Sequence, residues 1–257
     1  MKKVRAKKHL GQHFLKDTSI AREIANSLSG EGYENVVEVG PGMGMLTQFI
    51  LAKNFTAHLI EIDSESVVFL KAKYPKLSQR IHYTNFLDLN LTTITAKTFA
   101  LIGNFPYNIS SQILFKALDY KDQIPEIVGM FQKEVAERVA SSPGNKKYGI
   151  ITVLLQAYYN IEYLFTVNED VFDPAPNVKS GVIRLKRNDK KKLDCNEKFF
   201  KQVVKQSFSQ RRKTLRNSLK TLIGNHDFKD PLFSLRAEAL SVEDFMYLTN
   251  LLERIKP

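Results

Sequence analysis

Short apolar runs alternate with longer helical patterns through the first part of the chain. The candidate strands, rich in β-branched and aromatic residues, are 35–40, 57–62, 80–86, 99–105 and 126–131. Helical periodicity covers residues 18–28, 45–53, 64–74, 110–120 and 133–142. Strands that alternate with helices predict an α/β fold with a doubly wound, largely parallel sheet.

The pattern changes in the last third of the chain. Residues 160–167 and 180–187 are candidate strands with no long helix between them, which predicts an antiparallel hairpin at the sheet edge. A polar linker at 187–198 follows. Beyond this linker, helical periodicity recurs at residues 200–208, 215–222 and 241–255. We therefore expect an α/β domain over 1–187 and a small all-α domain over 188–257.

Composition narrows the class of protein. The chain has 257 residues, 43% of them hydrophobic, and a single cysteine, Cys195, which excludes internal disulfides and a cysteine-based zinc site. The basic N-terminus lacks the apolar core of a signal peptide. The longest apolar run, 150–159, contains Gln156 and is too short to span a bilayer. We expect a cytoplasmic, monomeric protein without metal or membrane contact.

Positive charge is concentrated in two blocks. Residues 1–16 carry six basic side chains and residues 198–220 carry eight, without one acidic residue in either block. The net charge is +11, yet the rest of the chain has 24 basic against 27 acidic residues. Localised blocks favour a polyanionic partner, most plausibly nucleic acid, although a basic tail and a solvated helix face remain an alternative. The candidate RNA-binding residues are Arg211, Arg212, Lys213 and Arg216.

A glycine-rich turn follows the first candidate strand. In VEVGPGMGML, Glu38 precedes Gly40, Gly42 and Gly44 at alternate positions, so that the backbone turns sharply and a ligand approaches closely. A dinucleotide fingerprint would need glycine at position 45, which is methionine. An acid beside the loop suits S-adenosylmethionine, because this cofactor carries a sulfonium and an ammonium instead of a pyrophosphate.

The second candidate strand ends in LIEID, about twenty residues beyond the glycine turn. A carboxylate at Glu61 can accept hydrogen bonds from both ribose hydroxyls of an adenosine. The alternative is that Glu61 is an exposed acid at the start of the next helix, a role for which Asp63 is equally well placed. Ser64 is the expected N-cap of this helix. The turn and the acid together favour an adenosine-containing ligand.

The fourth candidate strand ends in Asn104-Phe105-Pro106-Tyr107. Pro106 restricts the residue before it and removes a backbone donor, which predicts a rigid, extended loop. The Asn104 side-chain oxygen and a backbone carbonyl beside Pro106 would bind the hydrogens of an adenine amine. Tyr107 would stack on the base. A simple strand-ending turn is the alternative for this tetrapeptide alone.

The motifs together resemble the ribosomal RNA adenine dimethyltransferases of the KsgA type. The resemblance rests on HLGQHFL (9–15), VEVGPGMG (37–44), IEID (60–63), GNFPYNISS (103–111), VFDPAPNVKSGVIRL (171–185) and SFSQRRKTLRNSL (207–219). It implies a Rossmann-like domain that uses S-adenosylmethionine. Two methyl groups would go to each of two adjacent adenosines in the 3′-terminal hairpin of 16S rRNA in the small ribosomal subunit, with the helical domain binding RNA.

The resemblance also assigns roles to individual residues. It implies that Phe172 sandwiches the target adenine with Tyr107. The Asp that usually contacts the cofactor adenine aligns with Asn85, unless the register slips and Asp88 takes this role. The cofactor-binding residues that the resemblance implies are His13, Leu15, Gly40, Gly42, Glu61, Asn85 and Asn104.

Two other functions stay open at the level of sequence. An Erm-like enzyme that methylates 23S rRNA shares the motifs of the first half, and only SFSQRRKTLRNSL favours the small-subunit enzyme. A non-catalytic, RNA-binding assembly factor is the second alternative. The intact Asn104–Tyr107 loop and glycine turn argue against that alternative.

Overall fold

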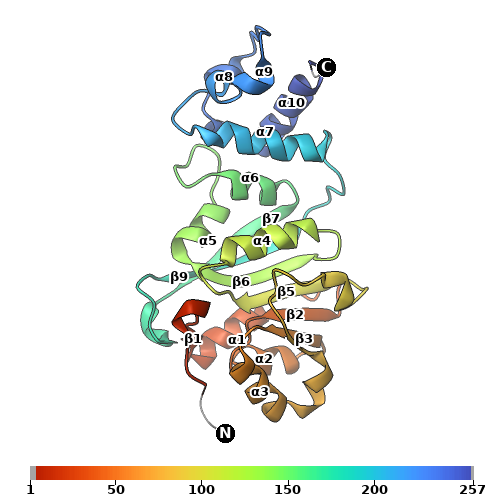
Figure 1. Cartoon of the computed structure of the whole chain (residues 1–257), viewed down its shortest axis with the longest axis vertical. Coiled ribbons are helices and arrows are strands. Elements are labelled where there is room, and N and C mark those ends of the chain that lie inside the picture. Colours follow the sequence, from red (N-terminus) through yellow and green to blue (C-terminus); the bar gives the residue numbers. More distant parts are fainter. Residues whose placement is uncertain (1–3, 256–257) are drawn as a thin grey trace. The chain divides into compact units, whose positions relative to one another are not determined.

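The structure, a computed structural model, describes residues 4–255 (Figure 1). Among these residues, seven strands form one sheet in the order β4-β3-β2-β5-β6-β9-β7. The strands are β2 Asn35–Val39, β3 Thr56–Glu61, β4 Ile81–Tyr83, β5 Phe99–Asn104, β6 Glu126–Gln132, β7 Tyr159–Val167 and β9 Ser180–Arg187. The neighbouring strands β4, β3, β2, β5 and β6 are parallel to one another, and β9 is antiparallel to β6. The predicted α/β class and parallel sheet are confirmed.

Helices connect most of these strands. They are α2 Thr47–Leu51, α3 Ser64–Lys73 and α4 Ser110–Asp119, with α1 Thr18–Asn26 before β2 and α5 Lys133–Val139 after β6. From β2 the chain passes through α2, β3 and α3 to β4 at one edge of the sheet. From β5 it then passes through α4 to β6, in the opposite direction across the sheet. Because parallel crossovers are right-handed, this reversal puts α4 on the sheet face opposite α2 and α3.

The core beneath α1 and α2 follows from strand periodicity. Val36, Ala100 and Val128 alternate with residues of the opposite face and pack in one cluster with Ile24 and Ile50. All five side chains are completely buried. The sheet is therefore covered on both faces, which leaves the carboxyl ends of its strands as the place for a ligand, at the switch point between β2 and β5.

A short second sheet fixes the N-terminal segment. β1 (Phe14–Leu15) pairs antiparallel with β8 (Phe172–Asp173), so that Leu15 lies opposite Phe172. Neither two-residue strand was predicted, because a strand this short carries no periodicity of its own. The pairing joins two motifs that lie more than 150 residues apart in the sequence.

The helical unit contains more of the chain than the sequence indicated. One compact unit comprises the chain up to Ala136 and Ile161–Arg187, and the other comprises Glu137–Asn160 and Asn188 onward. The second unit thus begins again at the predicted boundary after residue 187 but also includes 137–160. Its helices are α6 Ile150–Gln156, α7 Glu197–Ser209, α8 Leu215–Ser218, α9 Lys220–Ile223 and α10 Val242–Glu253.

Helix α6 coincides with the apolar run for which no element was predicted. Its residues from Ile151 to Leu155 are all buried, and without a polar face the run has no helical period to detect. Around it, the rings of Tyr148 and Phe208 lie 6.3 Å apart, and those of Phe208 and Phe245 lie 5.9 Å apart. Within residues 4–255, no helix is both long and apolar enough to cross a membrane.

The start of α3 differs from the expectation. Asp63, not Ser64, is the N-cap, and its carboxylate accepts hydrogen bonds from the backbone N–H groups of Glu65 and Ser66. Ser64 is the first helical residue instead. An aspartate at this position satisfies orphan donors and also favours the positive end of the helix dipole.

Candidate functional site

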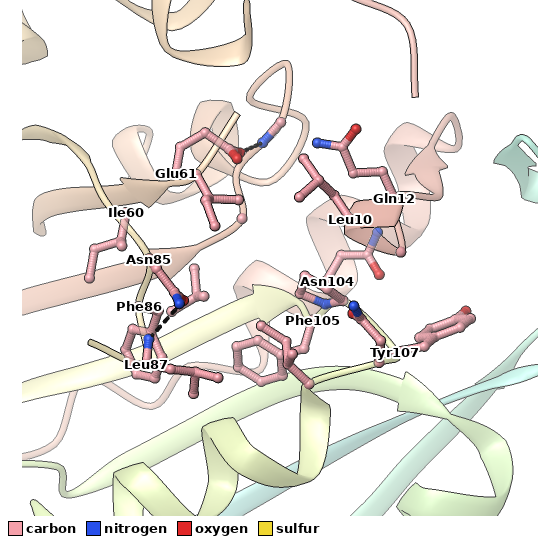
Figure 2. A pocket seen from close by; sticks show the side chains of 18 of the residues that line it. Leu10, Gln12, Ile60, Glu61, Asn85, Phe86, Leu87, Asn104, Phe105 and Tyr107 are labelled. Carbon is pink, nitrogen blue, oxygen red and sulfur yellow. Dashed lines mark hydrogen bonds between the residues drawn. The ribbon is translucent and has the colours of Figure 1, made fainter. Parts of the chain in front are cut away.

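A cavity opens at the carboxyl ends of β2, β3 and β5. Figure 2 shows Leu10 and Gln12 of the N-terminal segment on one side of the cavity and Asn85, Phe86 and Leu87 on another. The predicted site residues that line this first cavity are His13, Gly40, Gly42, Glu61, Asn85, Asn104, Pro106 and Tyr107. Residues spread over more than 90 positions of the sequence thus meet at one sheet edge.

Glu61 is held by two backbone groups. One carboxylate oxygen accepts a hydrogen bond from the N–H of Gly42 and the other from the N–H of Asp63, both at 2.9 Å. The residue is 3% exposed, and burial raises the pKa of its carboxyl group, against the effect of these two hydrogen bonds. Each oxygen keeps a second lone pair, so the fixed carboxylate is prepared to accept hydroxyl donors from a ribose.

The glycine turn has the conformation that its residues allow. Gly40 and Gly42 have φ values of +67° and +54°, in the region that residues with side chains rarely adopt. A Cβ at Gly42 would also lie 2.8 Å from a ring carbon of Phe14. The turn therefore brings bare backbone to the cavity wall, as a close ligand contact requires.

A second cavity adjoins the first and shares Phe14, Gly40 and Asn104 with it. The predicted residue Leu15 and the acid Glu38 line this second cavity. Glu38 is 2% exposed, and Thr47 donates a 2.6 Å hydrogen bond to it. Burial raises the pKa of Glu38 to about 8, and the charge of Lys73, which lines the same cavity, acts in the opposite direction.

The chemistry of the two cavities fits S-adenosylmethionine. Among the described residues, no lysine or arginine lines the first cavity, which is unsuited to a pyrophosphate. Two buried acids, Glu38 and Glu61, instead suit a cationic nucleoside. The apolar side chains of Ile62 and Phe86 add surface for a base.

Asn104 is oriented by one end of its amide. Its Nδ2 donates a 2.9 Å hydrogen bond to the carbonyl oxygen of His13, which leaves Oδ1 as the end without a partner among the described residues. The next carbonyl oxygen, of Phe105, is likewise unpaired there, whereas that of Pro106 accepts from Ile109 N at 3.2 Å. Two acceptors, Asn104 Oδ1 and Phe105 O, thus remain beside Pro106 for an incoming amine.

Tyr107 is fixed at both its hydroxyl and its ring. The hydroxyl lies 2.5 Å from Oγ of Ser180, which is completely buried at the start of β9. The imidazole of His13 stacks on the ring, with centroids 5.4 Å apart. Nδ1 of His13 in turn lies 2.7 Å from the carbonyl oxygen of Pro174. Ser180 and Pro174 were not predicted as site residues, although both belong to the quoted motif at 171–185.

Phe172 lies elsewhere than the other predicted residues. It is 2% exposed and packs in the same core cluster as Leu15 and Val167. It lines neither of the two cavities. Its place in β8 explains this position, because pairing with β1 directs it into the core. Stacking of Phe172 on a target base would therefore require a different position of its side chain.

The choice between Asn85 and Asp88 is also informed by the geometry. Asn85 lines the first cavity, whereas Asp88 does not. Asn85 Nδ2 donates to Asp88 Oδ2 at 2.8 Å, and its Oδ1 accepts from Leu87 N at 3.1 Å. Asp88 therefore acts on Asn85 and not on the cavity, which supports Asn85 as the ligand-facing residue.

Several lining residues were not predicted as site residues, although Leu10, Gln12 and Ile62 lie within the quoted motifs at 9–15 and 60–63. Leu10, Gln12, Ile62, Phe86 and Leu87 all line the first cavity. Ile62 and Phe86 follow the ends of β3 and β4, so the rule that ligands bind beyond the carboxyl ends of parallel strands would have found them. Leu10 and Gln12 belong to the motif at 9–15, whose signal is the resemblance and not a secondary-structure pattern.

The four predicted RNA-binding residues have different environments. Arg211 pairs with Glu238 at 3.0 Å and donates to the carbonyl oxygens of Lys146 and Tyr148. Arg216 pairs with Asp227 at 3.3 Å. The side chains of Arg212 and Lys213 are exposed and make no hydrogen bond or ion pair within the described part of the chain.

The sheet order and the paired cavities define a Rossmann-like class I methyltransferase that uses S-adenosylmethionine. The family described as "Ribosomal RNA adenine dimethylase" matches residues 3–253. The chain belongs to this family.

Individual relatives agree with this assignment. A protein of Flavobacterium johnsoniae named "Ribosomal RNA small subunit methyltransferase A" is 56% identical over 98% of both chains. Another of that name, from Porphyromonas gingivalis, is 56% identical over 99% of this chain and 100% of its own.

Two solved structures share the fold. A dimethyladenosine transferase from Plasmodium falciparum has a TM-score of 0.77 at 24% identity, covering 94% of this chain and 97% of its own. The 23S rRNA methyltransferase ErmE has a TM-score of 0.70 at 22% identity, covering 93% and 99%.

Proposed function

We propose that this chain transfers methyl groups from S-adenosylmethionine to the N6 amines of two adjacent adenosines in the 3′-terminal hairpin of 16S rRNA, in the small ribosomal subunit. The observation that carries the proposal is the pair of acceptors without a partner in residues 4–255, Asn104 Oδ1 and Phe105 O, at the wall of the cavity that Glu61 lines. The near full-length identity to small-subunit methyltransferases supports the choice of RNA.

The residues of the loop would act by positioning and electrostatics. The adenine amine is a poor nucleophile because its lone pair is delocalised into the ring. Asn104 Oδ1 and Phe105 O would accept its two hydrogens and favour a tetrahedral nitrogen. Bound S-adenosylmethionine supplies an electrophilic methyl group with a good leaving group. Tyr107 would hold the base by stacking, with its ring fixed through Ser180.

The assignment of the other residues is part of the same proposal. Glu61 would bind the ribose, Asn85 the adenine of the cofactor, and Leu15 with Glu38 the methionine end. We propose that Phe172 joins the base sandwich only after its side chain leaves the core. The helical unit would supply the RNA-binding surface. Monomeric state and cytoplasmic location stay predictions.

The test is methylation of purified small subunits that lack these methyl groups. Incubation with labelled S-adenosylmethionine should yield N6,N6-dimethyladenosine on nucleoside analysis. Asn104→Ala should abolish transfer and leave RNA binding nearly intact. Label only on naked 23S rRNA would favour the Erm-like alternative. No label on either RNA, with binding intact, would favour a non-catalytic assembly factor.

A further inference from the structure

The N-terminal segment 7–15 forms one wall of the first cavity. Five consecutive residues, Leu10 to Phe14, line it. The segment is tied down near its end by the bond from Asn104 to the His13 carbonyl and by the pairing of β1 with β8.

Lys7 attaches the beginning of this segment. Its ammonium forms an ion pair with Asp63, whose side chain is 0% exposed, and a second at 3.1 Å with Glu65. The Lys7 side chain itself is 28% exposed. A carboxylate buried to this degree depends on its partner, because an unpaired buried charge is costly. Asp63 is therefore the stronger of the two anchors.

Asp63, the partner of Lys7, is hydrogen-bonded directly to Glu61, the proposed ribose-binding acid. The backbone N–H of Asp63 donates to Glu61 Oε1 at 2.9 Å. On the other side, the backbone N–H of Lys7 donates to Oε1 of Gln12 at 2.8 Å, and Gln12 lines the cavity. Lys7 thus connects a residue of the N-terminal wall with the loop that orients Glu61.

We propose that Lys7 is a positioning residue for the cofactor and not part of the RNA-binding basic block in which it lies. Its ion pair with Asp63 holds the wall 10–14 against the loop after β3, so that the cavity keeps the shape that binds S-adenosylmethionine. The neighbouring Lys8 is exposed, and its side chain has no partner among the described residues. In this proposal, Lys8 contacts a phosphate of the RNA. This inference rests on the proposed cofactor site at Glu61.

The test compares Lys7→Met with Lys8→Met, which remove the same charge from adjacent positions. Calorimetric titration of the full chain with S-adenosylmethionine should show binding weakened about tenfold in Lys7→Met, the size of one lost charge-assisted hydrogen bond. Lys8→Met should bind the cofactor like the parent protein. Lys7→Arg should recover most of the affinity.

RNA binding should show the reverse pattern. For Lys8→Met, the magnitude of the negative slope of log K against log salt should decrease by about 0.7–0.9, the amount expected for one lost phosphate contact. For Lys7→Met it should stay unchanged, since the Lys7 charge is already compensated by Asp63 and Glu65. Asp63→Asn, which keeps the helix cap, should reproduce the loss of cofactor affinity.

Unchanged cofactor affinity in both Lys7→Met and Asp63→Asn overturns the role of Lys7, and so does an equal loss in Lys8→Met. Glu61→Gln separates this result from failure of the site itself. Its new amide would face the N–H donors of Gly42 or Asp63, so affinity should fall sharply. Unchanged affinity in Glu61→Gln would refute the proposed site as well.

Discussion

At the scale of single residues, each polar side chain of the site uses one group to contact the protein and leaves another group available to a ligand. Asn104 uses Nδ2 to bind the protein and keeps Oδ1 for a ligand. Tyr107 uses its hydroxyl to bind Ser180 and offers its ring. Glu61 accepts one backbone N–H per oxygen and keeps a lone pair on each. Substitutions that keep the shape of such a residue but remove its anchor should therefore impair function through positioning alone.

The contact between Ser180 and Tyr107 gives the first prediction. Ser180→Ala and Tyr107→Phe each remove one partner of the same 2.5 Å hydrogen bond, and both keep an aromatic ring at position 107. Each should lower kcat/KM for the RNA about fivefold, close to the 1 kcal/mol of a typical hydrogen bond. Affinity for S-adenosylmethionine should not change. Steady-state kinetics with undermethylated small subunits measures both effects.

The double variant is the control for this prediction. If the two residues act only through each other, Ser180→Ala with Tyr107→Phe should be no worse than either single change. If the two effects on kcat/KM multiplied, the residues would act independently, and this result would refute the positioning role of Ser180.

A pair of stacked imidazoles away from the site gives the second prediction. The rings of His58 and His82 lie 5.9 Å apart, and Nδ1 of His58 is buried without a hydrogen-bond partner in the described part of the chain. Burial lowers the pKa of His58 to about 4, and His82 and Arg80 act in the same direction. Between about pH 6.5 and 4 the unfolded chain therefore binds a proton that the folded chain does not.

The free energy of unfolding should accordingly fall as the pH drops through that window. His58→Phe keeps an aromatic ring for stacking and removes the titrating group, so it should flatten the dependence. Urea unfolding at several pH values measures the slope. His9→Phe, at an exposed position, is the matched control. A slope unaltered in His58→Phe would assign the acid sensitivity to other groups.

At the scale of elements, local pattern was informative where an element determines its own environment. Asn104 was predictable because an apolar strand delivers it to the sheet edge, and the parallel order puts Gly40 and Glu61 there too. Phe172 was not, because its burial depends on pairing with Leu15 across the chain. Helix α6 was missed because a helix buried on all sides lacks the period that identifies the others.

The packing beneath the loop 104–107, the proposed catalytic loop, gives the third prediction. Phe105 packs on Phe131 with centroids 5.0 Å apart, directly above the backbone of β6. A Cβ at Gly129 would lie 2.2 Å from a ring carbon of Phe105 and 2.8 Å from one of Phe131. Gly129→Ala should therefore displace Phe105 and cost about 1–3 kcal/mol of stability. Methyl transfer should fall even where the protein stays folded, because Asn104 precedes the displaced ring.

Gly149→Ala is the control for this overpacking. A Cβ at Gly149 meets no atom closer than 3.9 Å, so only a capping preference is lost, at a cost below about 1 kcal/mol. Thermal denaturation of both variants compares the costs. Equal stability losses would show that the close packing under Phe105 relaxes without strain.

At the scale of the whole molecule, net charge overstates the surface that RNA can use. Arg211 and Arg216 lie in the basic block of the helical unit, but each is paired with an acid and also bonded to backbone carbonyls. Arg212 and Lys213 keep their charges free among the described residues. The block thus contains two paired arginines that make structural contacts and two exposed charges that we propose face phosphate. Sequence counts cannot separate the two, because the distinction depends on tertiary partners.

Paired substitutions make this division measurable. Arg212→Gln with Lys213→Gln and Arg211→Gln with Arg216→Gln remove the same net charge. The first pair should lower the slope of log K against log salt for RNA binding by about 1.5 and leave the melting temperature unchanged. The second pair should leave the slope nearly unchanged, since Glu238 and Asp227 already compensate its charges.

The second pair should instead lower the melting temperature by several degrees, because the carbonyl oxygens of Lys146, Tyr148 and Phe228 lose their donors. Fluorescence anisotropy with an RNA hairpin at several salt concentrations and thermal denaturation give the two readouts. If both pairs lowered the slope equally and neither changed the melting temperature, all four residues would face RNA. The helical unit would then be held together by its apolar core, around Phe208 and Phe245, without help from its arginines.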